Sequence, residues 1–86
     1  MRRSIDDHPM GDDEVPPGED GEFQQVSWAV AVSDDYEDAE PRLVLTVEEI
    51  GKRGAGLVAH LTPAVARRLR IALRDGLREL GEDPGT

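Results

Sequence analysis

The feature that most constrains this fold is a change of hydrophobic period at Thr62 and Pro63. Before these residues, apolar side chains alternate with small or polar ones in three short segments, as in strands that bury one face. After them, apolar side chains recur every three or four positions, as on one side of a helix. Thr can accept a hydrogen bond from amides of a first helical turn, and Pro suits the first position because it lacks an N–H. The order therefore predicts strands followed by a helix that begins at residue 63.

Strands are expected at residues 24–33, 42–50 and 55–61. The acidic segment 34–41 connects the first two, and the glycine-rich segment 51–56 closes a hairpin between the second and third. The helix is expected to stop at Gly81, because glycine commonly ends helices. The fold class is therefore α+β, with a three-stranded, mainly antiparallel sheet followed by one C-terminal helix packed on it (β-β-β-α).

The first 22 residues differ in composition from the rest of the chain. They contain eight acidic residues, two arginines, three prolines and three glycines. Such a segment cannot bury enough apolar surface to offset the conformational entropy lost on folding. We therefore expect a disordered acidic tail over residues 1–22, a folded domain over residues 23–81 and a short C-terminal tail over residues 82–86.

The composition also excludes several classes of protein. The chain has 86 residues, a net charge of -9 and no cysteine, so it has no disulfide framework and no thiolate metal site. No apolar run is long enough to span a bilayer, and the N-terminal residues lack the apolar stretch of a secretory signal. A small acidic protein of the cytoplasm is therefore expected.

No catalytic or metal-binding arrangement is recognisable in the sequence. His8 lies in the expected tail and His60 on a strand face opposite the helix, with no third nitrogen or sulfur ligand spaced for zinc. The acidic segment 34–41 lacks the glycine of a calcium loop, and Leu45 stands where the final glutamate should be. The serines have no base in a recognisable constellation. We therefore expect no enzyme activity, no cofactor and no bound metal.

The expected helix has an apolar face and a basic face. On a wheel at 100° per residue, an arc of about 140° contains only apolar and small residues. These are Val65, Ala66, Leu69, Ala72, Leu73, Gly76, Leu77 and Leu80. A second arc contains the arginine row, defined as Arg67, Arg70, Arg74 and Arg78, with Ile71 at its edge. The row is either a solvated face that shields apolar surface or the contact site of an anion.

Three anions are candidates for the arginine row. They are the acidic tail of the chain itself, an acidic surface on a partner protein, and nucleic acid phosphate. Like charges three or four residues apart on a helix cost roughly 0.2–0.5 kcal/mol per pair, which is the argument for a bound anion, whereas the solvated face is the simpler interpretation. The net charge of -9 disfavours nucleic acid because a polyanion repels an acidic chain.

A homodimer is expected because the folded part is small. A single core in fewer than about 70–80 residues supplies only about 3–5 kcal/mol, and no disulfide or metal adds to it here. Two chains could join by strand addition at a sheet edge or by packing of sheet faces. The expected oligomer interface is the sheet face opposite the helix together with two small helical residues. Its members are Ala29, Ala31, Val44, Thr46, Val58, His60, Ala72 and Gly76. The last two either fit closely over the sheet or admit a second chain.

Residues 28–80 also resemble a known family. The pieces that match are Ser33-Asp34-Asp35, Leu61-Thr62 and Ala66-Arg67-Arg68-Leu69-Arg70 with Leu73. They resemble the N-terminal dimerisation domain of the xenogeneic-silencing, DNA-bridging nucleoid proteins of high-GC Gram-positive bacteria. The Arg-Gly-Arg minor-groove element of that family has no counterpart here. The resemblance therefore implies a dimer that forms mixed oligomers with a DNA-binding relative rather than a DNA binder.

The function expected from these features is that of a non-catalytic, dimerising protein–protein interaction module with a regulatory role. Its protein partner would present an acidic surface to the arginine row or would use an exposed sheet edge. The alternative is a nucleoid-associated or DNA-regulatory protein that binds DNA, or a DNA-binding relative, through the arginine-rich helix.

Overall fold

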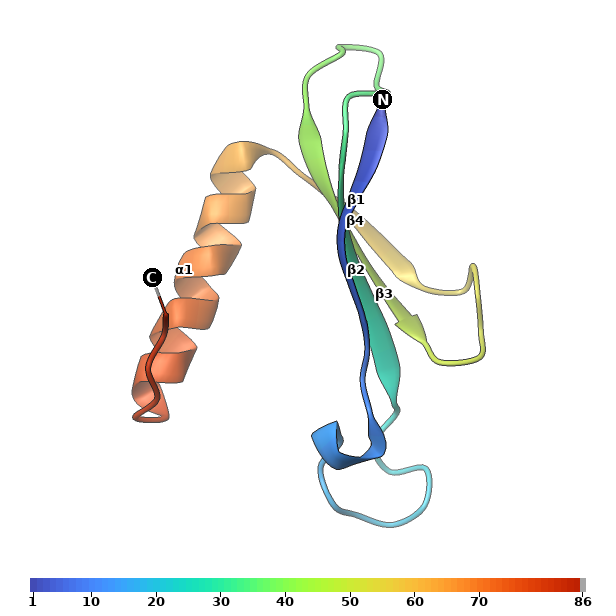
Figure 1. Cartoon of the computed structure of the whole chain (residues 1–86), viewed down its shortest axis with the longest axis vertical. Helices are drawn as coiled ribbons and strands as arrows, with labels where there is room; N and C mark the ends of the chain where they lie inside the picture. The colour runs from blue at the N-terminus through green and yellow to red at the C-terminus, as the bar shows by residue number, and fades with distance from the viewer. Residues whose placement is uncertain (86) are drawn as a thin grey trace.

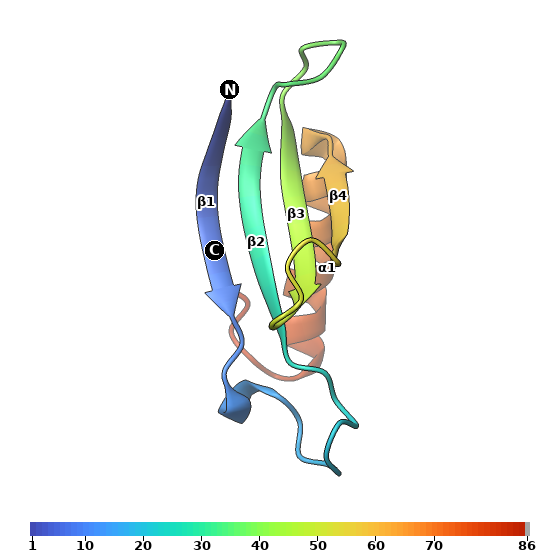
Figure 2. The same cartoon turned by 90° about the vertical axis from the view of Figure 1, so that its right-hand side faces the viewer.

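The computed structural model describes residues 1–85 and consists of an antiparallel sheet followed by one helix. The strands are β1 (Arg2–Pro9), β2 (Val26–Ser33), β3 (Arg42–Glu49) and β4 (Leu57–Leu61). A short 3-10 helix, η1 (Asp12–Glu14), follows β1, and the chain continues after β4 into α1 (Pro63–Glu79). Figure 2 shows the strands side by side in the order β1-β2-β3-β4, with α1 behind β3 and β4.

The predicted three-stranded sheet and the predicted disordered tail over residues 1–22 are wrong. β1 pairs antiparallel with β2 from Arg2 opposite Ser33 to Pro9 opposite Ser27, with an irregularity between Ser4 and Asp6. Without β1, the outer edge of β2 would present a row of unpaired backbone groups. The side chains of β1 remain almost entirely exposed. Its pairing therefore satisfies backbone hydrogen bonds without burying the apolar surface that the composition lacks.

The remaining elements lie where the hydrophobic period places them. β2, β3 and β4 lie within the three expected strand segments, and the register pairs Val30 with Leu45 and Leu45 with Ala59. At the start of α1, the Thr62 Oγ1 accepts a hydrogen bond from the Val65 N–H at 3.3 Å. Just beyond α1, Gly81 has a φ of 75°, the left-handed conformation that favours glycine and commonly ends helices.

The sheet has two unlike faces. The helix-side face carries Val30, Leu45 and Leu61, and the far face carries Ala31 and Val44. Among residues 1–85, the buried apolar side chains are Ala31 and Val44, at 7% and 1% exposure, and both lie on the far face. The best-buried part of the molecule is therefore the face that α1 does not cover.

The helix does not pack tightly across the sheet. α1 follows β4 directly and touches only β3 and β4, and no residue of it is buried. Figure 1 shows α1 running beside the sheet at an angle that opens toward the C-terminal end of the helix. The radius of gyration of the chain is 15.2 Å, whereas a compact 86-residue domain has a radius of gyration of about 12 Å. The chain is therefore much more open than a compact domain of its length.

Candidate interaction surface

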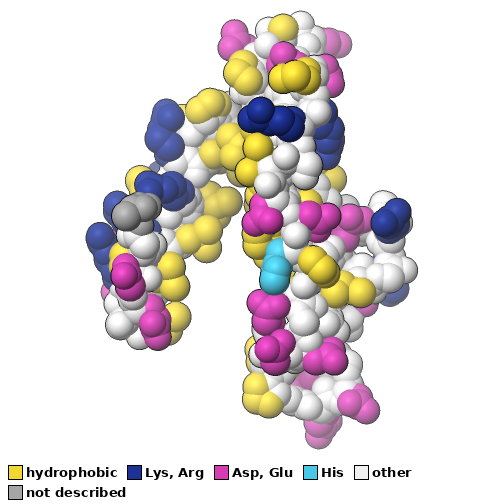
Figure 3. Space-filling view, viewed as in Figure 1, with side chains coloured by type: hydrophobic (Ala, Val, Ile, Leu, Met, Phe, Trp, Pro, Cys, Tyr) yellow, Lys and Arg dark blue, Asp and Glu magenta, His cyan; other side chains and the backbone are white. Residues whose placement is uncertain are grey.

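An open apolar groove of about 280 Å³ lies between α1 and the helix-side face of the sheet. We call it the α1 groove. From the sheet it is lined by Val30, Leu45 and Leu61, and from the helix by Ala66, Leu73 and Leu77. In Figure 3, hydrophobic side chains gather along the side of α1 that faces the sheet. The hydrophobic period of the sequence correctly predicts that these residues face one another. The helix and the sheet nevertheless do not pack tightly, so a groove remains between them.

The apolar face of α1 is largely open to solvent. Val65, Leu69, Leu73, Leu77 and Leu80 are between 38% and 76% exposed. Such exposure costs free energy, because a fully buried leucine or valine contributes about 1.5–3 kcal/mol relative to an exposed one. A set of large apolar side chains left uncovered along one helix makes this face a candidate interaction surface.

The two small residues of the predicted interface on α1 face away from the sheet. Ala72 is exposed, and a Cβ added at Gly76 would meet no atom within 4 Å. Of the two interpretations of these residues, the structure therefore disfavours a close fit over the sheet. Their place on an open helix face is compatible with the approach of a second chain.

The far face, which holds the other predicted interface residues, is partly covered by the chain itself. The Tyr36 hydroxyl is hydrogen bonded to His60 Nδ1 at 2.8 Å, and the Arg42 guanidinium lies 4.7 Å from the centre of the Tyr36 ring. Arg42 Nη2 donates to Asp38 Oδ2 at 2.6 Å. Hydrogen bonds from Arg42 hold the pKa of the Asp38 carboxyl well below its usual range. We call these four residues the Tyr36 cluster.

The residues predicted for an interface on the far face differ in their access to solvent. Ala31 and Val44 are buried within the chain, whereas Ala29 and Thr46 are half-buried. Val58 and His60 are exposed, and His60 belongs to the Tyr36 cluster. The sequence predicted only an acidic connection over residues 34–41, and the role of Tyr36 within it was missed. The signal was a lone aromatic residue in that connection, six positions before an arginine.

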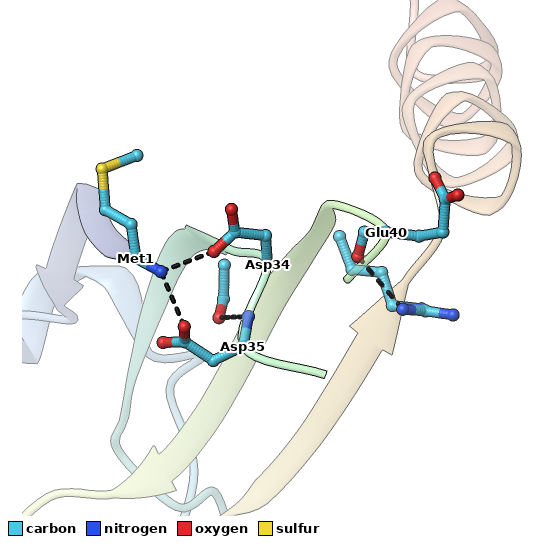
Figure 4. Close-up of polar contacts among 6 residues, drawn as sticks. Met1, Asp34, Asp35 and Glu40 are labelled. Atoms are coloured by element: carbon cyan, nitrogen blue, oxygen red, sulfur yellow. Dashed lines mark hydrogen bonds and ion pairs between the residues drawn. The ribbon is translucent and has the colours of Figure 1, made fainter. Parts of the chain in front are cut away.

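The start of the same connection is held against the N-terminus. Figure 4 shows the Met1 nitrogen between Asp34 and Asp35, with the Asp35 carboxylate 2.6 Å from it. The Asp35 N–H donates to Ser33 Oγ at 3.1 Å. A hydrogen bond and the positive charge of the Met1 ammonium lower the pKa of Asp34. These contacts hold the N-terminal end of β1 beside the C-terminal end of β2.

The other end of β1 is held by His8. Its ring lies 5.5 Å from the Trp28 ring, between centres, and its Nε2 is 2.9 Å from Glu14 Oε1. A backbone hydrogen bond from Gly11 and the contact with His8 lower the pKa of Glu14. His8, which the sequence placed in a disordered tail, therefore links β1 to both β2 and η1 through its contacts with Trp28 and Glu14.

The arginine row lies along one side of α1. Figure 3 shows basic side chains on the side of the helix away from the sheet, and acidic side chains concentrated on and around the sheet. Arg70 and Arg74 also line the α1 groove, and Arg74 Nε is 3.4 Å from Asp75 Oδ1. β1 is at the opposite end of the strand order from β4, which leads into α1. The N-terminal acidic residues are therefore held at the other edge of the sheet from the start of the helix.

Metal ligands and membrane spans were sought in the part of the chain that the structure describes. Residues 1–85 contain no group of three or more His, Asp or Glu side chains that could hold a metal ion. Over the same residues, α1 is too short and too polar to cross a membrane. Comparison of the chain with protein families, with curated proteins and with solved structures found no match.

Proposed function

We propose that this chain is a small, non-catalytic protein–protein interaction module that works as a dimer. The observation that supports the proposal is an excess of exposed surface. The chain exposes 6965 Å², whereas a compact monomer of 9.4 kDa exposes about 5,000 Å². The uncovered apolar face of α1 and the α1 groove contribute to this excess.

The excess is sufficient for a stable dimer. A standard protein–protein interface removes about 800 Å² from each partner, and this chain exposes roughly 2,000 Å² more than a compact protein of its mass. The large side chains exposed on the apolar face of α1 are leucines and one valine, whose burial supplies most of the free energy of association. Dimerisation would thus provide the hydrophobic contacts that a single copy lacks.

The mass of the chain in solution tests this proposal. We expect sedimentation equilibrium of residues 1–86 to give twice the 9.4 kDa chain mass. A second copy should cover the apolar residues of α1, so dimerisation should also slow amide exchange along the helix. A single species of chain mass at every concentration examined would contradict the proposal.

The arginine row is the proposed contact site for an acidic partner in the cytoplasm, where the module would act as a regulator. Replacing Arg70 and Arg74 with glutamate should weaken binding of a fluorescent polyglutamate peptide about tenfold, since each exposed ion pair contributes up to about 1 kcal/mol. Fluorescence anisotropy measures this change. Arg53→Glu, in the hairpin between β3 and β4, is the matched control and should leave the affinity unchanged. Equal binding by the wild type and the double variant would remove the arginine row from the proposal.

The spacing of the arginine row also favours a second candidate function. Four arginines at intervals of three and four residues form a continuous basic edge, which can contact successive phosphates of DNA. The resemblance to xenogeneic-silencing proteins adds a mixed oligomer with a DNA-binding relative to this candidate. An electrophoretic shift of duplex DNA at low salt, lost in the same double variant, would favour it over an acidic protein partner. The net charge of -9 disfavours this second candidate, because a nucleic acid is a polyanion and repels an acidic chain.

A further inference from the structure

We infer that two copies of this chain pair through α1 in an antiparallel arrangement, about a two-fold axis that passes between Ala72 and Leu73. The inference rests on the dimer proposed above and specifies its interface. It places the contact on α1 rather than on the far face of the sheet. Three features of the helix support it, namely the width of its apolar face, the position of Gly76 and the order of its charges.

The apolar face of α1 is wide enough for two contacts. An arc of about 100° suffices for a helix that covers one surface, and this face spans about 140°. Leu69, at the centre of the arc, and the edge with Ala66, Leu73 and Leu77 line the α1 groove. The other edge, with Val65 and Gly76, is turned away from the groove. This second edge is a strip of apolar and small residues that no part of the described chain covers.

Gly76 provides a place for a large side chain from a second helix. A Cβ at this position would have no neighbour within 4 Å in the single chain. In an antiparallel pair centred between residues 72 and 73, Leu69 of one copy lies at the height of the partner's Gly76. The two-fold axis repeats this contact, and it also places Val65 level with the partner's Leu80. Small residues allow helix backbones to approach closely, so a leucine can fill the space above the glycine.

The charges at the solvent edge of the same face fit an antiparallel pair. This edge contains Arg68, Asp75 and Glu79. Within one chain, Arg68 and Asp75 are seven residues apart, or about 10 Å along the helix. In the antiparallel pair, Arg68 lies two residues, or about 3 Å along the axis, from both the partner's Asp75 and the partner's Glu79. A parallel pair would instead turn Arg68 toward the opposite edge of the partner's apolar face, away from the partner's Asp75 and the partner's Glu79.

The far face is a weaker choice for the same partner. Its central apolar residues, Ala31 and Val44, are buried within the chain, and the Tyr36 cluster lies on that face. The arginine row is turned toward the side of α1 opposite the partner helix. Antiparallel pairing of α1 therefore leaves the row accessible for the acidic ligand proposed above.

Cysteine cross-linking tests the arrangement, because the chain has no cysteine of its own. We expect Ala72→Cys, close to the two-fold axis, to form a disulfide-linked dimer on mild oxidation. Val65→Cys alone should not cross-link, since the two copies of residue 65 would be about 22 Å apart. A mixture of Val65→Cys and Leu80→Cys should yield the mixed dimer. Non-reducing electrophoresis and mass spectrometry distinguish these products.

The outcomes separate this inference from the dimer proposal. If the variants sediment as dimers but Ala72→Cys does not cross-link, the dimer stands and the α1 interface is overturned. Self-linking of Val65→Cys would show that the helices are parallel, which also overturns the arrangement. Variants that sediment as single chains, like a monomeric wild type, would contradict the proposed dimer itself.

A charge exchange provides an independent test. Arg68→Glu should weaken dimerisation at least tenfold. In the antiparallel pair, the new glutamate of each copy would lie beside the partner's Asp75 and the partner's Glu79, and like charges repel. Arg68→Glu combined with Asp75→Arg and Glu79→Arg should restore it. Sedimentation equilibrium measures both variants, and circular dichroism checks that the helix is retained. Recovery by the triple variant supports direct contact across the interface, whereas failure to recover with the helix intact overturns the charge pairing.

Discussion

Leu69→Asp is expected to convert the dimer into monomers, weakening association about 100-fold or more. Leu69 lies at the centre of the apolar face of α1 and is 39% exposed in the single chain. An aspartate there remains solvated in a monomer, but the interface would bury one unpaired carboxylate from each copy. The change should therefore act on association much more than on folding. Sedimentation equilibrium across a concentration series measures the effect.

Ile71→Asp is the matched control for this substitution. Ile71 is on the same helix and is 44% exposed, close to the value for Leu69, but it lies at the edge of the arginine row. We expect this variant to dimerise like the wild type. If both variants remain dimeric, or if both dissociate, the apolar face of α1 does not have the selective role assigned to it.

Deletion of residues 1–9 is expected to destabilise the sheet by at least about 2 kcal/mol, since each lost backbone hydrogen bond contributes about 0.5–1.5 kcal/mol. The deletion removes β1 and exposes the edge of β2, which should also promote aggregation. Urea unfolding followed by Trp28 fluorescence measures the loss, because the Trp28 ring contacts His8 of β1. A disordered tail would give the opposite result, with stability unchanged.

Hydrogen exchange of the intact chain checks the same prediction without a deletion. The β1 amides that pair with β2 should exchange slowly, whereas those of Gly18, Asp20 and Gly21, which lie outside any helix or strand, should exchange fast. A Gly-Ser replacement of residues 16–21 is the matched variant and should leave both the β1 protection and the unfolding free energy unchanged. Uniformly fast exchange over residues 1–22 would mean that β1 does not form.

The sequence predicts the parts of the fold that depend on hydrophobic period. Val30, Leu45 and Leu61 alternate with smaller or polar neighbours and come together on one face, and Thr62 begins the helix as its side chain predicts. β1 has no such pattern. Its pairing depends on main-chain groups, on the Met1 nitrogen and on His8, none of which a side-chain composition reveals.

The candidate site was predicted only in part for a related reason. The helical wheel identifies the apolar face of α1 and the arginine row, because both follow from the rotation of 100° per residue in an α-helix. It does not give the angle between the helix and the sheet, which leaves Leu73 and Leu77 facing an open groove. Nor does alternation predict that the far face is partly covered, because Tyr36 comes from outside the strands.

The Tyr36 cluster has a consequence for how chains of this kind can vary. The connection between β2 and β3 has the acidic composition of a freely evolving loop, yet its tyrosine must reach His60 and Arg42. An insertion or deletion there would displace the ring and uncover the best-packed part of the sheet. The turn after β3, where Gly51 and Gly54 adopt positive φ, is held by local contacts such as the Gly54 N–H donating to Glu48 Oε2 at 2.7 Å. Length changes among descendants of this sequence should therefore accumulate in the glycine turn and be rare in the acidic connection.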